Sequence, residues 1–495
     1  MLRKIRTVTA VVFFVGVTLL FLDFSGTLAA WLGWMAKVQF LPAVLSLNVA
    51  VVVGLIILTL IFGRVYCSVI CPLGILQDVE WRIANMFHKK NRTTFSKERK
   101  WLRYGMLAIF ILLLLMGFTG IAALVAPYSS YGRMAQNLLQ PVWLLGNNLL
   151  AMAAEHFESY AFYNKEVWLR SLPTFVVAVV SFVAIAVLAW RGGRTYCNTI
   201  CPVGTVLSFF SRFSWFRIYF DSEKCRSCSL CTKNCKASCI DYKHHYVDDS
   251  RCVACGDCLS KCSFGALHYG HPKKGKTAEP AGDNMENEGR RHFLLGAALA
   301  TTAAATAQKQ KKVDGGMATI VDKQAPDRRT PITPPGSLSA QNMSQHCTAC
   351  QLCVAECPND VLRPSTDLDH FMQPEMSYER GYCRPECNRC SQVCPAGAIK
   401  PITKAEKTAV HMGHAVWIKK NCVVVTDGVE CGNCARHCPA NAIEMVPIDP
   451  NDDLSPKIPA VNEARCIGCG ACENLCPSRP FSAIYVEGHE VHRMD

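Results

Sequence analysis

Residues 466–477 read Cys-Ile-Gly-Cys-Gly-Ala-Cys-Glu-Asn-Leu-Cys-Pro, which spaces four cysteines as C-x2-C-x2-C-x3-C. Three further stretches keep this spacing, and they begin at Cys225, Cys252 and Cys347. A thiolate at every third residue wraps a compact iron-sulfur cluster, whereas disulfide frameworks staple distant loops. The 29 cysteines of this 495-residue chain therefore predict 4Fe-4S clusters rather than disulfides.

Two more cysteine groups, beginning at Cys383 and Cys422, have gaps of three and eight residues after their first cysteine, which we interpret as inserted loops. In two-cluster bacterial ferredoxins, the fourth cysteine of each run ligates the cluster of the other run. Crossed pairing therefore predicts six 4Fe-4S clusters. The predicted ligand sets are Cys225, Cys228, Cys231 with Cys262; Cys252, Cys255, Cys258 with Cys235; Cys347, Cys350, Cys353 with Cys394; Cys383, Cys387, Cys390 with Cys357; Cys422, Cys431, Cys434 with Cys476; and Cys466, Cys469, Cys472 with Cys438.

Cys239 is left over from this pattern and is an alternative ligand to Cys235, although the spacing favours Cys235. The proline that usually follows the fourth cysteine is absent from the first two runs, where Lys236 and Ser263 stand instead. Zinc is the main competing metal, but zinc ribbons use two separated C-x2-C knuckles rather than triple runs that end in Cys-Pro. We therefore assign the metal as the iron of 4Fe-4S clusters.

The apolar residues are concentrated in the first 190 positions. Runs at about residues 8–30, 43–62, 104–126 and 173–190 approach or exceed the length that crosses a bilayer, and they predict four spanning helices. Lys and Arg gather before the first run, between the second and third, and after the fourth, so the positive-inside rule puts both ends of this bundle in the cytoplasm. The net charge of +13 follows from this orientation and gives no indication of nucleic-acid binding.

The bundle contains an internal repeat. Gly63-Arg-Val-Tyr-Cys67-Ser-Val-Ile-Cys71-Pro-Leu-Gly74 returns as Gly193-Arg-Thr-Tyr-Cys197-Asn-Thr-Ile-Cys201-Pro-Val-Gly204. We expect the two halves to be related by an axis along the membrane normal, with both motifs at the cytoplasmic face, by analogy with parallel repeats in transporters. Cysteines four residues apart share one helix face, so the four thiols are expected to meet.

Several roles are open for Cys67, Cys71, Cys197 and Cys201. They could bind a further metal centre, cycle between thiol and disulfide, or bind copper or a haem transiently, because soft thiolates suit all of these. A purely structural role as small buried side chains is a further alternative. We favour a redox role without fixing its form.

Asp23 is an ionisable residue late in the first predicted span, and such a residue is a functional candidate, here as a proton acceptor for quinol. It could instead lie at the membrane interface. The predicted spans contain no histidine, which argues against a b-type haem held between helices.

Residues 271–340 read as a linker that is rich in Lys, Gly, Ala and Pro. Within it, Gly289-Arg-Arg-His-Phe-Leu-Leu295 and the weakly apolar stretch to about Ala307 resemble a twin-arginine export signal. A flexible or amphipathic cytoplasmic linker is the alternative. An export signal would place the C-terminal half in the periplasm, with residues 293–307 either spanning or cleaved.

The predicted fold class is an α-helical membrane bundle of four transmembrane helices with an internal repeat, joined to α+β modules of the bacterial-ferredoxin type. The predicted domains are a membrane domain at 1–215, a two-cluster ferredoxin domain at 216–270, a linker at 271–340, and two-cluster ferredoxin modules at 341–405 and 406–495.

With these motifs in place, residues 1 to about 270 resemble NapH, the four-helix polyferredoxin family related to NosR. Residues 285–495 resemble the exported four-cluster ferredoxin NapG. The resemblance implies a multi-pass protein of a bacterial inner membrane that acts in anaerobic respiration as a quinol dehydrogenase component. Its implied partners are the quinone pool and a periplasmic reductase or c-type cytochrome.

The expected function is therefore electron transfer through six clusters, and the direction of flow is not encoded in any residue. An assembly or metal-reducing factor, in which the Cys-x3-Cys-Pro motifs handle a metal, is the alternative.

Overall fold

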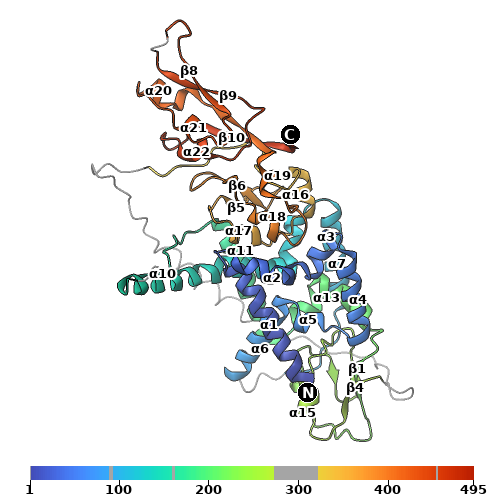
Figure 1. Cartoon of the computed structure of the whole chain (residues 1–495). Coiled ribbons are helices and arrows are strands. Elements are labelled where there is room, and N and C mark those ends of the chain that lie inside the picture. Colours follow the sequence, from blue (N-terminus) through green and yellow to red (C-terminus); the bar gives the residue numbers. More distant parts are fainter. Residues whose placement is uncertain (1, 88–92, 159–161, 272–320, 453–454, 495) are drawn as a thin grey trace, which may run out of the picture.

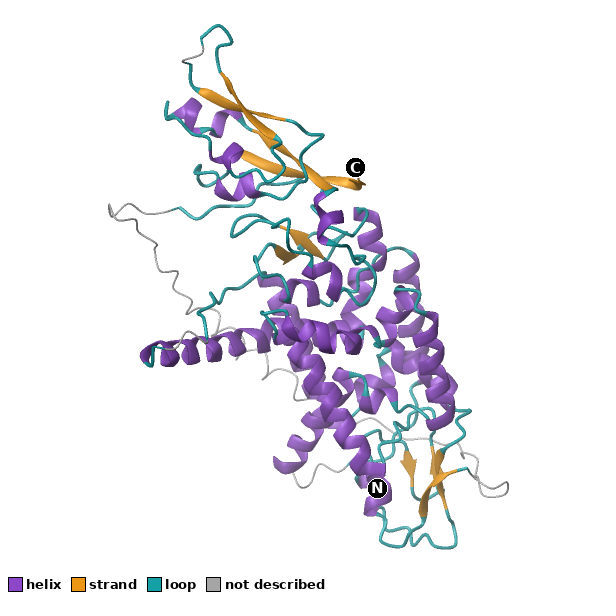
Figure 2. Ribbon diagram, viewed as in Figure 1, coloured by secondary structure: helices purple, strands orange, loops and turns teal. Residues whose placement is uncertain are grey.

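The computed structural model describes residues 2–87, 93–158, 162–271, 321–452 and 455–494. The segment that resembles an export signal, 289–307, lies outside these residues. The described chain forms a helical region with a ferredoxin-type part at each end, and the strands are confined to the two ferredoxin-type parts (Figures 1 and 2).

Residues 2–211 form the helical region. Its elements are α1 (Leu2–Leu22), α2 (Thr27–Lys37), α3 (Phe40–Leu45), α4 (Val49–Phe62), α5 (Tyr66–Val69), α6 (Pro72–Phe87), α7 (Lys100–Leu115), α8 (Thr119–Ala122), η1 (Ala123–Val125), α9 (Pro127–Met134), the π-helix η2 (Ala135–Leu139), α10 (Gln140–His156), α11 (Leu172–Gly192), α12 (Thr195–Thr199) and α13 (Pro202–Ser211). Figure 1 shows α10 extending sideways, away from the bundle.

Two helices are long and apolar enough to cross a membrane by length and composition, namely Arg3–Leu22 and Leu172–Gly192. The other predicted spans are shorter than expected. Residues 43–62 divide into the end of α3 and the 14-residue α4, because the chain turns at Ser46–Asn48. Residues 104–126 divide into the 16-residue α7, α8 and η1, because the chain turns at Gly117, whose φ is 83°. The first span ends at Leu22 rather than residue 30.

The internal repeat is visible as a repeated backbone path. Gly63 and Gly193 end α4 and α11 with φ angles of 77° and 63°, which glycine adopts without a steric penalty. A short helix follows in each copy, and a proline at position 72 or 202 then begins a third helix. Both copies therefore reverse the chain at equivalent positions of the repeat.

The first ferredoxin-type part follows α13. Its elements are β1 (Arg217–Phe220), α14 (Leu230–Lys233), β2 (Ile240–Asp241), β3 (Tyr246–Val247), α15 (Asp257–Lys261) and β4 (Leu267–Gly270). Antiparallel β1 and β4 pair from Arg217 with Gly270 to Phe220 with Leu267, and β2 pairs with β3. We call this part the inner module.

The second ferredoxin-type part begins with the extended chain from residue 321. Its elements are α16 (Ala340–His346), α17 (Leu352–Ala355), β5 (Leu362–Pro364), β6 (Pro374–Met376), α18 (Arg389–Val393), α19 (Lys404–Thr408), β7 (Val410–Trp417), η3 (Lys419–Asn421), α20 (Val423–Thr426), α21 (Asn433–Arg436), β8 (Ile443–Pro447), β9 (Lys457–Val461), α22 (Ala471–Leu475) and β10 (Ile484–Met494). The antiparallel pairs are β5–β6, β7–β10 and β8–β9. We call this part the outer module.

The inner and outer modules lie at opposite ends of α1 (Figure 1). At the start of the helix, Arg3 pairs with Asp257 of the inner module at 3.1 Å. Just past its end, Gly26 lies against the Arg389 guanidinium of the outer module. The 21 residues of α1 correspond to a helix about 30 Å long at 1.5 Å per residue, so the helical region separates the two modules by about this distance.

Candidate functional site

Cavities in both modules are lined by the cysteines that the sequence groups together. In the inner module, one cavity is lined by Cys225, Cys228, Cys231 and Cys262. In the outer module, three cavities are lined by Cys347, Cys350, Cys353 and Cys394; by Cys422, Cys431, Cys434 and Cys476; and by Cys438, Cys466, Cys469 and Cys472. Each cavity thus gathers one predicted set, with the crossed fourth cysteine included.

The two other sets are also brought together. Burial raises the pKa of the Cys390 thiol well above its usual value, and the nearby thiols of Cys383, Cys357 and Cys387 add smaller contributions. Burial, and after it Cys255, Cys252 and Cys235, does the same for Cys258. In both cases the interacting thiols include all three remaining members of the predicted set, and Cys231 of the neighbouring set also interacts with Cys258.

This geometry fits a cluster better than a single ion. Among the described residues, no three Cys, His, Asp or Glu side chains form a group that could hold one metal ion. In a 4Fe-4S cluster the cysteines bind the corners of a cage and stand further apart. The residues present therefore fit the cluster, while the ligation itself stays a prediction.

The choice between Cys235 and Cys239 stays open in the structure. Their sulfur atoms are 3.5 Å apart and both side chains are buried. Both thiols therefore reach the same site.

The four cysteines of the internal repeat meet in the core of the helical region. Cys67, Cys71, Cys197 and Cys201 are all at most 4% exposed and belong to one hydrophobic cluster. Cys201 lies within electrostatic range of the other three thiols. The expected meeting of the four thiols is thus found, and we call this group the repeat cysteine site.

Two buried arginines join the two copies of the repeat, because each donates a hydrogen bond to a backbone carbonyl of the other copy. Arg64 donates to the carbonyl oxygen of Cys197 at 3.2 Å, and Arg194 donates to that of Cys67 at 2.5 Å. A Cβ on Gly74 would lie 2.3 Å from the Cys67 oxygen, and one on Gly204 would lie 2.3 Å from the Cys197 oxygen. The two copies therefore bind each other through equivalent atoms.

The inner module docks on this site through buried charges. Asp78 of α6 accepts from Arg194 at 2.7 Å and from Lys236 at 2.5 Å, and Arg6 lies at 3.4 Å. Lys236 also pairs with Asp257 at 3.3 Å. The lysine that replaces the usual proline after Cys235 therefore joins the inner module to the repeat.

Backbone contacts reinforce this docking. The Arg194 amide donates to the carbonyl of Lys236 at 2.8 Å, and Asn198 Nδ2 donates to the carbonyl of Ala237 at 3.2 Å. Arg64 Nη1 donates to the carbonyl of Ser250 at 3.0 Å. The segments next to Cys235 and Cys252 are therefore held against the internal repeat.

The outer module docks on the opposite side of the helical region. A Cβ on Gly132 of α9 would lie 2.5 Å from the carbonyl oxygen of Cys350, and Asn137 donates to Gln351 Oε1 at 3.1 Å. Tyr128 lies within electrostatic range of Cys350 and Cys394. A predicted cluster set thus faces the helical region through contacts to its own ligands.

Buried tyrosines occupy the space between the two sides. Tyr66 and Tyr196 lie within electrostatic range of the repeat cysteines, and Tyr128 is close to Tyr66. All three are at most 6% exposed. Cysteine spacing gave no signal for these residues, although Tyr66 and Tyr196 occupy equivalent positions in the repeat.

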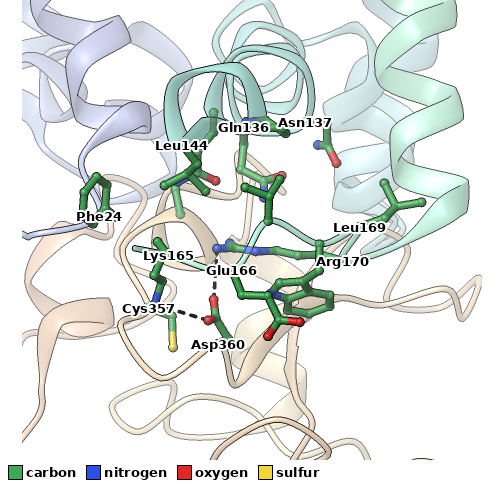
Figure 3. Close-up of a pocket in the computed structure, with 15 residues that line it drawn as sticks. Phe24, Gln136, Asn137, Leu144, Lys165, Glu166, Leu169, Arg170, Cys357 and Asp360 are labelled. Atoms are coloured by element: carbon green, nitrogen blue, oxygen red, sulfur yellow. Dashed lines mark hydrogen bonds and ion pairs between the residues drawn. The ribbon is translucent and has the colours of Figure 1, made fainter. Parts of the chain in front are cut away.

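A further cavity lies where α10, the 165–170 segment and the outer module meet (Figure 3). It has a volume of about 580 Å³ with its open mouth and is lined by apolar side chains such as Phe24, Leu144 and Leu169 and by the Cys357 ligand candidate. Asp360 pairs with both Lys165 and Arg170 at its rim, each at 3.4 Å. The buried Gln136 Oε1 accepts no hydrogen bond from the described residues.

Asp23 lies next to this cavity and has a structural role. It is 6% exposed and accepts hydrogen bonds from the backbone amides of Ser25, Gly26 and Leu28 and from the Ser25 hydroxyl. These contacts fix the turn between α1 and α2. They do not test its role with quinol, which stays a prediction.

Comparison with known proteins gives matches in both halves. Residues 47–93 and 174–219, which hold the two copies of the repeat, match a 4Fe-4S binding domain. Residues 346–408 and 429–479 match a 4Fe-4S dicluster domain.

Several curated relatives are named as ferredoxin-type proteins. The methylamine utilization ferredoxin-type protein MauM of Methylobacillus flagellatus is 33% identical over 167 residues, which cover 32% of this chain and 70% of MauM. The ferredoxin-type protein NapF of Escherichia coli K12 is 28% identical over 161 residues, which cover 32% of this chain and 87% of NapF. The methylamine utilization ferredoxin-type protein MauN of M. flagellatus is 24% identical over 174 residues, covering 35% and 48%.

Proposed function

Because the chain belongs to the ferredoxin-type 4Fe-4S protein family of MauM, it is an iron-sulfur electron-transfer protein, and we propose that it carries electrons from membrane quinol to a periplasmic reductase or c-type cytochrome. The observation that carries this proposal is the docking of predicted cluster ligands against both ends of one helical region. Bound clusters accept and release one electron at a time. The six predicted ligand sets are part of the proposal.

The length of α1 supports a transmembrane arrangement. About 30 Å of helix matches the hydrocarbon thickness of a bilayer, and α11 is equally long. We assign four spans by adding α4 and α7, which are 14 and 16 residues long and would be completed by the short helices next to them. The basic residues near Arg3 and Arg194 favour the cytoplasm for the inner module, which leaves the periplasm for the outer module.

The cavity beside Cys357 is the proposed quinol site. Its apolar lining suits a quinone ring, and the unpaired Gln136 Oε1 can accept a hydroxyl hydrogen. The exposed apolar side chains at the start of α10, Val142 and Leu145, suit the isoprenoid tail. Oxidation releases two electrons and two protons per quinol. The electrons would leave singly towards the adjacent ligand set that includes Cys357, and the protons would leave through the open mouth.

A direct test is quinol oxidation by the purified full chain, followed by the bleaching of cluster absorbance. Leu144→Trp would fill the cavity and is expected to slow the bleaching without loss of iron. Leu149→Trp is the matched control, because this side chain lies on the same helix but is 66% exposed. Equal rates for the two variants would reject this cavity as the quinol site.

The topology can be tested independently with reporters fused after residues 265 and 340. We expect a cytoplasmic signal from the first and a periplasmic signal from the second. A cytoplasmic signal from both would end the proposal of electron transfer across the membrane to a periplasmic partner.

The alternative, a metal-reducing or assembly factor, has less support. It requires the repeat cysteines to handle a metal ion, and the part of the chain that the structure describes includes no group of three or more candidate ligands that could hold a single ion.

A further inference from the structure

We propose that Cys67, Cys71, Cys197 and Cys201 jointly ligate a seventh 4Fe-4S cluster, with two ligands from each copy of the repeat. This inference deepens the proposed function, because it names the redox centre between the two modules. Its test measures metal content, so it can fail or succeed without regard to quinol.

The first argument is that the repeat cysteine site has the same properties as the predicted ferredoxin sets. The four thiols interact electrostatically, lie almost fully buried, and do not form a group that could hold a single metal ion. The last cysteine of each copy precedes a proline, as in the runs that end at Cys357 and Cys476. Neither copy alone has enough ligands, so the cluster requires both.

The second argument is that hydrogen-bond donors point at the sulfur atoms. Gln77 Nε2 lies 3.3 Å from Cys197 Sγ, and the Gly204 amide lies 3.3 Å from Cys201 Sγ. Arg64 Nη2 lies 3.8 Å from Cys67 Sγ. Such donors stabilise thiolates and cluster sulfurs, and a purely structural group of thiols would not require them.

The third argument is charge. Arg64 and Arg194 are fully buried beside the thiols. Arg194 has Asp78 as its counter-ion, but the equivalent position in the second copy is Ser208, and no described carboxylate forms an ion pair with Arg64. A buried cation without a counter-ion is costly, and a cluster with four thiolates carries the negative charge that would compensate it.

The alternatives fit less well. A disulfide would carry no negative charge to compensate the buried Arg64 guanidinium. A copper or zinc ion would need its sulfur ligands about 2.3 Å from the metal, and the described residues include no group of three or more candidate ligands that could hold one ion. A cluster satisfies both the spacing and the charge.

The position gives this site a role. On one side, Lys236, which follows Cys235, contacts the Arg194 backbone and side-chain network. On the other side, Tyr66 and Tyr128 lead from the repeat cysteines to Cys350. A cluster here would take one electron from the module on one side and release it to the module on the other, and no net proton or bond change is required.

The decisive measurement is native mass spectrometry of the full chain, purified without oxygen, together with iron and acid-labile sulfide analysis. We expect the heaviest species to carry seven clusters, which is about 28 iron atoms, against about 24 for six. A heaviest species with only six clusters would overturn the proposal. So would a species in which copper, or a disulfide between two of the repeat cysteines, replaces the seventh cluster. A count of about 26 iron atoms would indicate a two-iron centre instead of a 4Fe-4S cluster at this site, and would also overturn the proposal.

Variants locate the seventh cluster. Cys67→Ser combined with Cys197→Ser should lower the heaviest species by one cluster and leave the other six. Ser68→Ala is the matched control, since Ser68 is fully buried on the same turn and carries no ligand atom in this proposal. If the double variant does not fold, the wild-type mass still decides between six and seven clusters.

Discussion

The inner and outer modules meet the same helical region by different means. The inner contact is built from buried charges, in which Asp78 faces Arg194, Lys236 and Arg6. The outer contact is built from close backbone approach and neutral side chains, as where Gly132 meets the carbonyl of Cys350. Its ion pairs, such as that of Arg170 with Asp360, lie at the rim of a cavity.

This difference shows that a module with predicted cluster ligands can be held close to the helical region in two physical ways. Buried charges fix one orientation but fail when a partner is removed, because the remaining charges stay buried. Close packing fails when volume is added. The inner contact should therefore respond to charge and pH, and the outer contact to side-chain size.

The largest effect is expected for Asp78→Asn. This change leaves Arg194 and Lys236 buried without their counter-ion, which typically costs about 3–5 kcal/mol. The inner module should detach, and the measurement is its protease sensitivity and thermal unfolding in detergent. Asp360→Asn is the matched control at the outer rim and should cost about 1 kcal/mol or less, because its pairs are partly exposed. Similar losses for both variants would contradict the comparison.

The same residue predicts a pH dependence. Burial alone would raise the pKa of Asp78, but Arg194 and Lys236 outweigh it and hold the pKa well below its usual range. A carboxylate with a lowered pKa stabilises the fold above its unfolded pKa of about 4 and loses this contribution as the pH falls further. Wild-type inner docking should therefore weaken below about pH 4, and Asp78→Asn should remove that dependence.

The sequence alone predicts the ligand sets well because their information is local. Cysteine spacing is read within a few dozen residues, and the cavities gather the same cysteines, for example Cys347 with Cys394. The charged contact could not be found this way. Asp78 is separated from Arg194 by 116 residues and from Lys236 by 158. The internal repeat contains Arg194, but nothing in the repeat indicates that Asp78 or Lys236 is its partner.

The helices show a second limit. Apolar length indicates that a segment prefers a bilayer, but it does not show where the chain turns. The breaks at Ser46–Asn48 and Gly117 lie within or beside apolar runs. They depend on tertiary packing and on single residues, such as Asn48, whose side chain caps α4 by accepting from the Val51 amide.

A smaller effect tests the outer contact. In Gly132→Ala the new Cβ would lie 2.5 Å from the Cys350 oxygen and 2.7 Å from the Phe21 ring, so the module must shift. Overpacking of this kind costs about 1–3 kcal/mol. Gly146→Ala on α10 is the matched control, because nothing lies within 4 Å of its added Cβ. Thermal unfolding should separate the two variants, and an outer contact that tolerates both would show that its packing is looser than proposed.

The smallest effect separates two neighbouring carboxylates of the inner module. Burial, and to a lesser extent Asp248, raises the pKa of Asp249 to about 7, although Arg217 opposes the shift. A carboxyl group with a raised folded pKa binds protons more tightly in the folded state, so it lowers stability as the pH rises from about 4 to about 7. Asp249→Asn should therefore stabilise the protein at pH 8, by about 1–2 kcal/mol.

Asp248 is the matched opposite, because the two residues are adjacent and similarly buried. Burial would raise its pKa, but Arg251 and the hydrogen bonds from Ser250 outweigh this and lower it. Asp248→Asn should therefore destabilise the protein at pH 8. Unfolding curves at pH 5 and pH 8 measure both variants. Effects of the same sign would mean that the stability effect of a buried carboxylate in the inner module does not depend on its neighbouring charges and hydrogen-bond donors. Opposite signs would establish that the inner module depends on the pairing of its charges rather than on their number.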